Sequence, residues 1–275
     1  MTEESILARL PRKHRNLVLG IGDDCAIYRP RRGEDLVFTT DFFIEGVHFK
    51  GRGLEQAARA VPLARSLSDI AAMGAVPRFC LVSLALPKWA DESWVAQFFD
   101  GLLELARETN TALAGGDLSH AKELVCDVMV CGSVPRGKAL RRDGARPGDA
   151  IYVSGPLGGW RHRAGVTPRL KEGQKLLGKA TACIDVSDGL ALDLHRLCVA
   201  SKVSASLDHV PLLEDATLKQ ALHDGEDYEL LYTAPPRLRV PGIRIGTIIR
   251  GNAGAISLNG QSIAPRGYDH FQNRT

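Results

Sequence analysis

The chain has 275 residues, 44% of them hydrophobic and 24% charged, which suits one large domain or two small ones with a substantial core. Its formal net charge of +3 is too small to indicate nucleic-acid binding by itself, because it implies no strong overall field. Glycine is abundant, at 28 residues, and excess glycine often marks places where backbone approaches a ligand closely.

The cysteines and the N-terminus bear on the cellular location. None of the six cysteines forms a C-x-x-C pair, so a structural zinc site is not expected. Residues 1–16 are charged and predict no signal peptide, and no apolar stretch approaches the roughly 20 residues of a membrane span. We therefore expect a reduced, cytoplasmic protein with neither a membrane nor a nucleic acid as partner.

The first half alternates predicted helices and strands. Pro62 is expected to kink the second helix, and Asp91 is expected to cap the third, which is strongly amphipathic. Helices are predicted over 3–10, 54–73 and 91–110, and strands over 35–41, 77–86, 111–117 and 124–134.

The second half begins after residues 135–149, a basic segment rich in Gly and Pro that marks a domain boundary. We expect one domain over 1–140 and another over 141–275, in a mixed α/β chain. In the second half, strands are predicted over 150–155, 182–185, 204–208, 228–234 and 242–249, with a helix over 189–201.

Acidic residues follow apolar β-like runs at five places. Any one of these clusters alone would be interpreted as a turn or a helix cap. Their recurrence argues otherwise, as does Asp69, which lies among apolar residues where an unpaired charge is costly. The clusters are Asp23 with Asp24, Asp41, Asp117, Asp185 with Asp188, and Asp224 with Glu226 and Asp227.

Carboxylates without His or Cys favour a hard cation, magnesium or calcium, over zinc. No EF-hand loop is present, and magnesium usually arrives with phosphates, so a nucleotide is the expected ligand. The usual nucleotide motifs do not fit. Residues 132–139, GSVPRGKA, resemble a P-loop but lack its Ser or Thr, and GIGDDC lacks the third glycine of a dinucleotide fingerprint.

The motifs, taken in order, resemble a known family. They are GIGDDCA, TTD, EGVHF, SLSDIAAMGA, AGGD, IDVSDGL, GEDYEL and GYDHF, and they run from residue 20 to residue 271. Together they are similar to the thiamine-monophosphate kinase family, within the aminoimidazole-ribonucleotide-synthetase-like (PurM-like) superfamily. EGVHF, GEDYEL and GYDHF are the motifs most specific to that family.

The resemblance implies an enzyme that transfers the γ-phosphoryl group of ATP directly to thiamine monophosphate, giving thiamine diphosphate. It implies a two-domain PurM-like fold whose N-terminal domain binds ATP and magnesium and pairs in a homodimer, while the C-terminal domain completes the site. It also implies roles for individual residues. Several magnesium ions would be held by Asp24, Thr39, Thr40, Asp41, Asp69, Asp117, Asp185 and Asp188. ATP would be bound by Gly116, Asp117, Arg142 and Ser187, thiamine phosphate by His48, Glu226 and Tyr268, and catalysis would depend most on Asp69, Asp188 and Arg142.

The chemistry supports these roles independently. Phosphoryl transfer needs positioning and neutralisation of oxygens more than covalent help, and here the acceptor is itself a phosphate. Two polyanions must meet, so several carboxylate-held magnesium ions could bridge them, and Asp24 would face one of them. Tyr268 could stack on a thiamine ring, and Glu226 could offset its cationic charge.

Purely structural or surface roles remain alternatives for some of these residues. His48 could be a satisfied histidine at a strand end, Tyr268 a surface residue, and Arg142 one member of a solvated basic run. The segment 155–182 is shorter than the family pattern leads us to expect. The alternatives are therefore a binding protein that has lost catalysis, or another ATP-using member of the superfamily.

Overall fold

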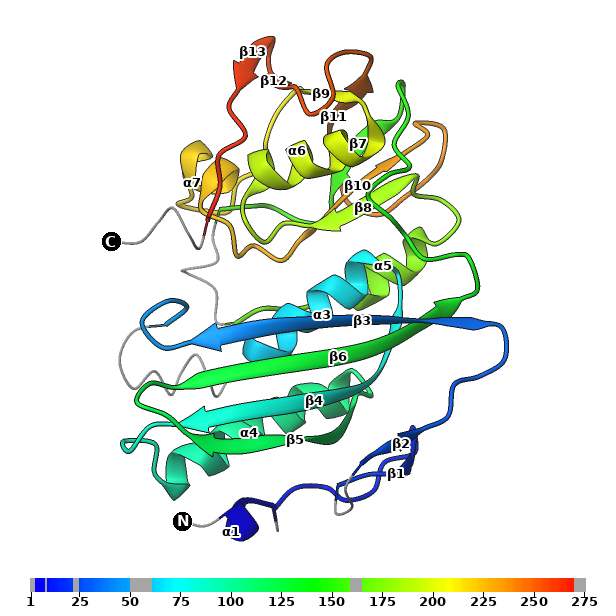
Figure 1. Ribbon diagram of the computed structural model, residues 1–275. Coiled ribbons are helices and arrows are strands. Elements are labelled where there is room, and N and C mark those ends of the chain that lie inside the picture. The colour runs from blue at the N-terminus through cyan, green and yellow to red at the C-terminus, as the bar shows by residue number, and fades with distance from the viewer. Residues whose placement is uncertain (1–2, 8, 22–24, 50–60, 159–164, 270–275) are drawn as a thin grey trace. The chain divides into compact units, whose positions relative to one another are not determined.

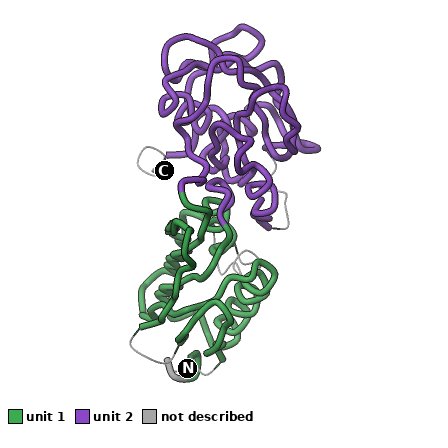
Figure 2. Tube along the Cα trace, turned by 90° about the vertical axis from the view of Figure 1, so that its right-hand side faces the viewer, with its two compact units in different colours: residues 1–70, 76–136 green, residues 71–75, 137–275 purple. Residues whose placement is uncertain are grey.

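The computed structural model describes residues 3–7, 9–21, 25–49, 61–158 and 165–269. The chain divides into two compact units (Figure 2). Unit 1 comprises residues 1–70 and 76–136, and unit 2 comprises residues 71–75 and 137–275. Each combines helices with a β-sheet, which confirms the mixed α/β class. Within the described residues, no helix is long and apolar enough to cross a membrane.

Unit 1 is built on a four-stranded sheet in the order β3-β6-β4-β5 (Figure 1). Strand β6 pairs antiparallel with β3 and β4, whereas β4 and β5 run parallel. A small antiparallel pair, β1 with β2, precedes the sheet along the chain. The bounds are β1 Leu17–Leu19, β2 Ile27–Tyr28, β3 Glu34–Ile44, β4 Val76–Leu86, β5 Ala112–His120 and β6 Val125–Pro135.

The two faces of this sheet differ because successive side chains of a strand point to opposite sides. On β4, Val82 and Leu84 are buried while Ser83 between them is exposed. The buried face lies against the helices of unit 1, which pass behind the strands in Figure 1. These helices are α3 (Val61–Ala72) and α4 (Glu92–Glu108), and a short α1 (Glu3–Leu7) begins the unit. We refer to the other side of the sheet as the open face.

Helix α4 forms as its sequence predicts. Asp91 caps it, its carboxylate accepting the Trp94 N–H at 2.9 Å, and the apolar stripe that includes Trp94, Phe98 and Leu102 is buried. Pro62 lies at the start of the described part of α3, so the kink expected there within a helix over 54–73 stays a prediction. One other helix prediction needs correction. Helix α1 ends at Leu7 instead of residue 10. Residues 54–60 lie outside the described part of the chain.

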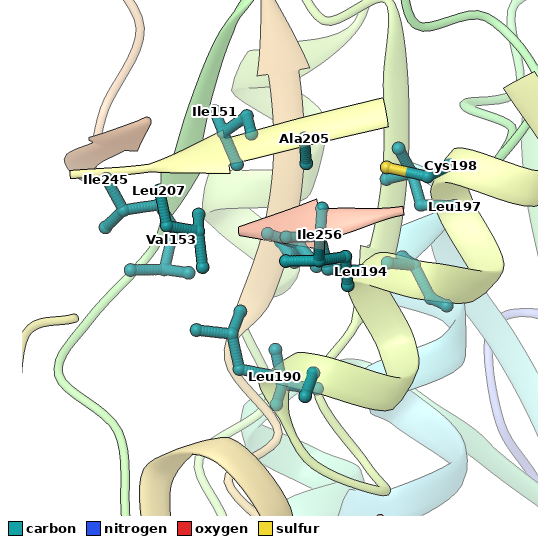
Figure 3. Packing of buried hydrophobic residues seen from close by; sticks show 14 of the residues in the cluster. Ile151, Val153, Leu190, Leu194, Leu197, Cys198, Ala205, Leu207, Ile245 and Ile256 are labelled. Carbon is teal, nitrogen blue, oxygen red and sulfur yellow. The ribbon is translucent and has the colours of Figure 1, made fainter. Parts of the chain in front are cut away.

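Unit 2 contains a seven-stranded sheet in the order β13-β12-β9-β11-β7-β10-β8. Its helix α6 (Leu190–Ser201) presents Leu190, Leu194 and Leu197 to the core, where they meet residues of the sheet such as Ile151 and Ile256 (Figure 3). The sheet's strands are β7 Ala150–Val153, β8 Ala182–Asp185, β9 Ser204–Leu207, β10 Leu230–Ala234, β11 Ile243–Ile249, β12 Ile256–Leu258 and β13 Gln261–Ile263. Two shorter helices complete the unit, α5 Leu170–Leu176 and α7 Leu218–His223.

Strand β10 begins at Leu230, two residues later than predicted. Glu226 and Tyr228, just before it, have φ angles of +56° and +51°, which no β-strand accommodates. The apolar pattern of residues 228–234 cannot reveal such a turn, since its residues are not glycine.

Candidate functional site

Carboxylates gather on the helix-covered face of unit 1, at the edge strand β3. The Thr39 hydroxyl donates to the Asp69 carboxylate of α3, which ties strand to helix. Asp41 lies two residues further along β3, on the same face as Thr39. The fold therefore places these three residues on one face of the sheet, and their role as magnesium ligands stays a prediction.

The surroundings of Asp41 disfavour its ionised form. Burial, followed by the negative charge of Asp69, raises the pKa of Asp41 to about 6, and Arg65 and Ser66 only partly offset this rise. Crowded carboxylates with a raised pKa lack sufficient positive charge around them. A cation bound here would supply that charge.

A second polar group lies on the open face of the same sheet. Asp127 of β6 pairs with Ser83 of β4, which in turn pairs with Asp117 of β5, so these three side chains form one row across the sheet. The Thr40 hydroxyl of β3 donates to the Asp127 carboxylate. Asp127 is absent from the predicted set, although its signal, an acid within the apolar strand VCDVMV, is visible in the sequence.

The fold thus separates the predicted residues of unit 1 into two groups. Thr39, Asp41 and Asp69 lie on the helix-covered face, and Thr40 and Asp117 lie on the open face. Because β3 and β5 are the two edges of the sheet, Asp41 and Asp117 are roughly 14 Å apart across it, at a strand spacing of about 4.8 Å. One copy of unit 1 does not bring these carboxylates to a single cation.

A cavity of about 1100 Å³ lies in unit 1 beside the row on the open face. Leu10, Leu17 and Tyr28 line it from the N-terminal segment, and Leu81, Gly116 and Asp117 line it from the sheet. A Cβ atom at Gly116 would lie 1.8 Å from the Val82 carbonyl oxygen, so only glycine fits the backbone at this point. Asp23 and Asp24, which lie between Leu17 and Tyr28 along the chain, are outside the described residues.

His48 lies in the turn that follows β3. Its side chain is buried, its Nδ1 accepts the Ile44 N–H at 2.9 Å, and its ring stacks on Phe43 with 6.0 Å between the centroids. These contacts fix the ring orientation. They are the contacts of a histidine that stabilises its own turn.

In unit 2, the predicted residues converge on the loop of residues 185–189 between β8 and α6. Asp185 ends β8 and is buried, and Ser187 and Asp188 follow it in the loop. The Ser187 carbonyl accepts the Glu226 N–H at 2.7 Å, and the Asp188 carbonyl accepts the Tyr268 N–H at 3.0 Å. Three motifs that are far apart in the sequence, IDVSDGL, GEDYEL and GYDHF, are therefore joined through one loop.

Close backbone packing holds these motifs together. A Cβ atom at Gly225 would lie 2.4 Å from the Ser187 carbonyl oxygen, and one at Gly267 would lie 2.3 Å from that of Asp188. The glycines that open GEDYEL and GYDHF are therefore required by the contact itself. The positive φ of Glu226 follows from the same turn, and it costs about 1–2 kcal/mol for a residue with a Cβ atom. Such strain is typical of functional sites.

The other acids of GEDYEL have structural partners. Asp227 is buried and accepts the Gly158 N–H at 2.9 and 3.0 Å. Glu229 is fully buried and receives both Nε and Nη2 of Arg169 at 2.8 and 2.6 Å. Removal of Arg169 would break a buried ion pair, a change that is typically strongly destabilising. These two acids therefore anchor the loop that presents Glu226.

Two residues of α6 that are not among the predicted site residues, Asp193 and Arg196, contact this loop. Asp193 is fully buried, and its Oδ2 accepts the N–H groups of Ser187 and Asp188 at 3.0 and 2.9 Å. Burial raises the pKa of Asp193 to about 6 against the effect of these bonds. Arg196 contacts the Asp188 and Asp193 carboxylates. An acid inside the apolar helix LALDLHR is the same kind of signal that singled out Asp69.

Arg142 lies in the exposed segment that runs beside β8. Its neighbour Arg141 accepts the Cys183 N–H through its carbonyl at 2.8 Å, and the Arg142 carbonyl accepts the Ser201 hydroxyl at 2.7 Å. The backbone is therefore fixed, while the side chain of Arg142 is exposed. An exposed guanidinium on a fixed backbone can bind a phosphate.

The donor atoms of both units suit magnesium. All are hydroxyl or carboxylate oxygens, the ligands that this cation prefers, and the raised pKa of Asp41 marks a place where positive charge is lacking. Within the described ranges, no three or more His, Cys, Asp or Glu side chains form a group that could hold a metal ion. Magnesium commonly takes only one or two carboxylates and completes its shell with phosphate oxygens and water.

Comparisons with known proteins agree over nearly the whole chain. A family model described as AIR synthase related protein, N-terminal domain, matches residues 22–134. The chain is 35% identical to the thiamine-monophosphate kinase of Escherichia coli (strain K12), with 92% of each sequence covered.

Two solved structures are also similar. The crystal structure of thiamine-monophosphate kinase from Stenotrophomonas maltophilia K279a has a TM-score of 0.82 at 35% identity, covering 94% of this chain and 96% of that one. The structure of AaThiL complexed with AMPPCP and TMP has a TM-score of 0.81 at 29% identity, covering 91% of this chain and 92% of that one.

Proposed function

The chain belongs to the thiamine-monophosphate kinase family, and on that premise we propose that it transfers the γ-phosphoryl group of ATP to the phosphate of thiamine monophosphate. The products are ADP and thiamine diphosphate. The transfer is direct and in line, without a phosphorylated enzyme intermediate. A catalytically inactive binding protein is the alternative that this family membership disfavours.

The observation that supports the proposal most directly is the joining of IDVSDGL, GEDYEL and GYDHF at one loop. It brings Asp185, Ser187 and Asp188, which we assign to magnesium and ATP, beside Glu226 and Tyr268, which we assign to thiamine phosphate. Donor and acceptor groups of a phosphoryl transfer must lie this close for reaction.

We assign the magnesium ions to Thr39, Thr40, Asp41, Asp69, Asp117, Asp185 and Asp188, with Asp24 as a further ligand. When bound, the ions neutralise phosphate oxygens on both substrates, which would otherwise repel each other. The protein's own contribution is to fix its oxygens in place. Thr39, for example, holds the Asp69 carboxylate through a hydrogen bond.

We assign Gly116 and Asp117 to ATP binding, with Arg142 and Ser187 as further contacts. The cavity of about 1100 Å³ beside Asp117 is large enough for a nucleotide. The exposed guanidinium of Arg142 suits the phosphate chain. The N-terminal domain, residues 1–140, would thus bind ATP and magnesium, and the C-terminal domain, residues 141–275, would bind thiamine phosphate through Glu226 and Tyr268. His48 would be the contribution of the N-terminal domain to thiamine phosphate.

We also propose that the protein is a homodimer that pairs through the open faces of its unit 1 sheets. Phe38 and Phe42, on that face of β3, are 63% and 56% exposed. Neighbouring large apolar side chains that are exposed in one chain often mark a surface that another protein chain covers. Asp117 and Thr40 share that face, so pairing would bring the carboxylates of two copies together. We place the reaction in the cytoplasm, where ATP is supplied.

The test is product formation from ATP, thiamine monophosphate and magnesium, followed by separation of thiamine diphosphate. We expect a product that disappears with a chelator and that is strongly reduced in Asp69→Asn. The matched control is Asp35→Asn, a half-buried acid of the same unit that pairs with Arg136 at 3.9 Å, and it should retain full turnover. Undiminished turnover in Asp69→Asn would remove Asp69 from the site.

A further inference from the structure

Arg196 links two carboxylates of unit 2 through a single nitrogen. Its Nη1 lies 2.5 Å from Asp188 Oδ2 and 2.7 Å from Asp193 Oδ1. The Asp193 side chain is fully buried, while those of Arg196 and Asp188 are 39% and 25% exposed. The guanidinium therefore lies between a buried anchor and a carboxylate that reaches solvent.

The same anchor fixes the backbone of the loop. Asp193 Oδ2 accepts the N–H groups of Ser187 and Asp188, just before the start of α6. The residue that caps α6, Gly189, has no side chain to satisfy these groups. Asp193 thus holds the main chain of Asp188, and Arg196 holds its side chain.

We propose that Arg196 is a positioning residue that orients the Asp188 carboxylate for magnesium, an inference that rests on the proposed function of this site. One carboxylate oxygen is engaged by Arg196, and a carboxylate has lone pairs on its other oxygen that a cation can take. Without the guanidinium, the charges of Asp188 and Asp193 would repel each other and turn the Asp188 side chain away.

The guanidinium has two opposing effects on a cation at Asp188. Its positive charge disfavours a second cation, while its hydrogen bond fixes the direction of the ligand. Mutation of a residue that hydrogen-bonds to a metal ligand typically lowers metal affinity or activity 10–100-fold. We therefore expect the orienting effect to exceed the repulsion, so that loss of Arg196 weakens metal binding.

The experiment measures Mn²⁺ binding to the full chain by electron paramagnetic resonance, with a non-hydrolysable ATP analogue present. In Arg196→Met, which keeps the apolar stem, we expect the Mn²⁺ dissociation constant to rise about tenfold or more. Arg196→Lys keeps the charge but loses the planar fork, so a smaller rise is expected. Arg244→Met is the control, since Arg244 is exposed on β11 and donates to Thr247 in the same strand.

The outcomes separate this inference from the proposed function. Unchanged or tighter Mn²⁺ binding in folded Arg196→Met overturns the inference, even if the wild-type chain makes thiamine diphosphate. Weaker binding supports it, even if no thiamine diphosphate forms, in which case only the proposed reaction fails. A wild-type chain that binds no Mn²⁺ also overturns it. Should Arg196→Met not fold, a dissociation constant in Arg196→Lys equal to that of the wild type overturns it.

Discussion

Glu226 combines backbone strain with a proposed contact to substrate. At φ +56°, a residue with a Cβ atom is disfavoured by about 1–2 kcal/mol relative to its normal conformation, a cost that glycine avoids. We expect Glu226→Gly to keep or slightly raise the free energy of unfolding, while the KM for thiamine monophosphate rises several-fold more than that for ATP. Steady-state kinetics and thermal melts measure both.

Asn259 provides the matched control for this prediction. It has a φ of +49° in the exposed turn between β12 and β13, far along the chain from the loop. Asn259→Gly should relieve the same kind of strain and leave both KM values unchanged. Equal KM effects in the two variants would show that Glu226 does not contact the thiamine substrate.

The ionised Asp41 carboxylate should lower the free energy of unfolding when no metal is bound. Its pKa of about 6, raised from 3.8 mainly by burial, means that the folded state holds this proton more tightly than the unfolded state does. At pH 7 the ionised carboxylate thus destabilises the metal-free protein. We expect Asp41→Asn to raise the free energy of unfolding by about 1–3 kcal/mol in the presence of a chelator, and to lower turnover.

The pH dependence provides the check. The folded state binds more protons than the unfolded state between pH 4 and pH 6, so the wild-type chain gains stability as the pH falls through this range. The difference in the free energy of unfolding between Asp41→Asn and the wild type, measured by chemical denaturation, should therefore shrink as the pH falls from 6 to about 4. A variant that is less stable than the wild type at pH 7 contradicts this account of Asp41.

At the scale of elements, most strands and helices follow from local patterns, and the exceptions have physical causes. Strand β4 and helix α4 match their apolar periodicity and cap signals closely. The start of β10 does not, because the turn before it uses non-glycine residues at positive φ. β12 and β13 are also missed, since three residues each are too short for a period to appear.

The site could be predicted from the sequence less completely than the fold. Asp69, Asp185 and Glu226 stand out because acids are unusual beside apolar runs. Asp193 carries the same signal inside the apolar helix LALDLHR, but its role and that of Arg196 depend on contacts between α6 and a loop, which the sequence does not reveal. The separation of Asp41 from Asp117 also depends on the strand order, which no local pattern contains.

The contact between GEDYEL and IDVSDGL can be tested through its glycine. Gly225→Ala places a methyl group 2.4 Å from the Ser187 carbonyl oxygen at a φ of +71°. We expect it to lower the free energy of unfolding by about 2 kcal/mol or more and to reduce kcat/KM. Urea denaturation and kinetics measure these two quantities.

Gly260→Ala separates the clash from the backbone strain. Gly260 has a φ of +79° but no heavy atom within 4 Å of an added Cβ, so only the left-handed penalty of about 1 kcal/mol applies. Its kcat/KM should equal that of the wild type. If both variants lose the same stability and activity, the loop contact does not organise the site.

At the scale of the whole molecule, the open face of unit 1 predicts the oligomeric state. Phe38 and Phe42 are its large exposed apolar residues on β3. We expect the double variant Phe38→Lys with Phe42→Lys to be monomeric in analytical ultracentrifugation, whereas the wild type sediments as a dimer. Val199→Lys, which changes an apolar residue of unit 2 that is 46% exposed, should leave the dimer intact. A wild-type chain that is monomeric at micromolar concentration contradicts the pairing.

The proposed reaction transfers a phosphoryl group directly between two phosphates. To test this, ATP that carries radioactive phosphorus at the γ position is incubated with the protein, thiamine monophosphate and magnesium, and the label is followed. We expect the label to appear in thiamine diphosphate in a 1:1 ratio to ADP, with no labelled protein. Label released only as inorganic phosphate, or binding of both substrates without transfer, would contradict it.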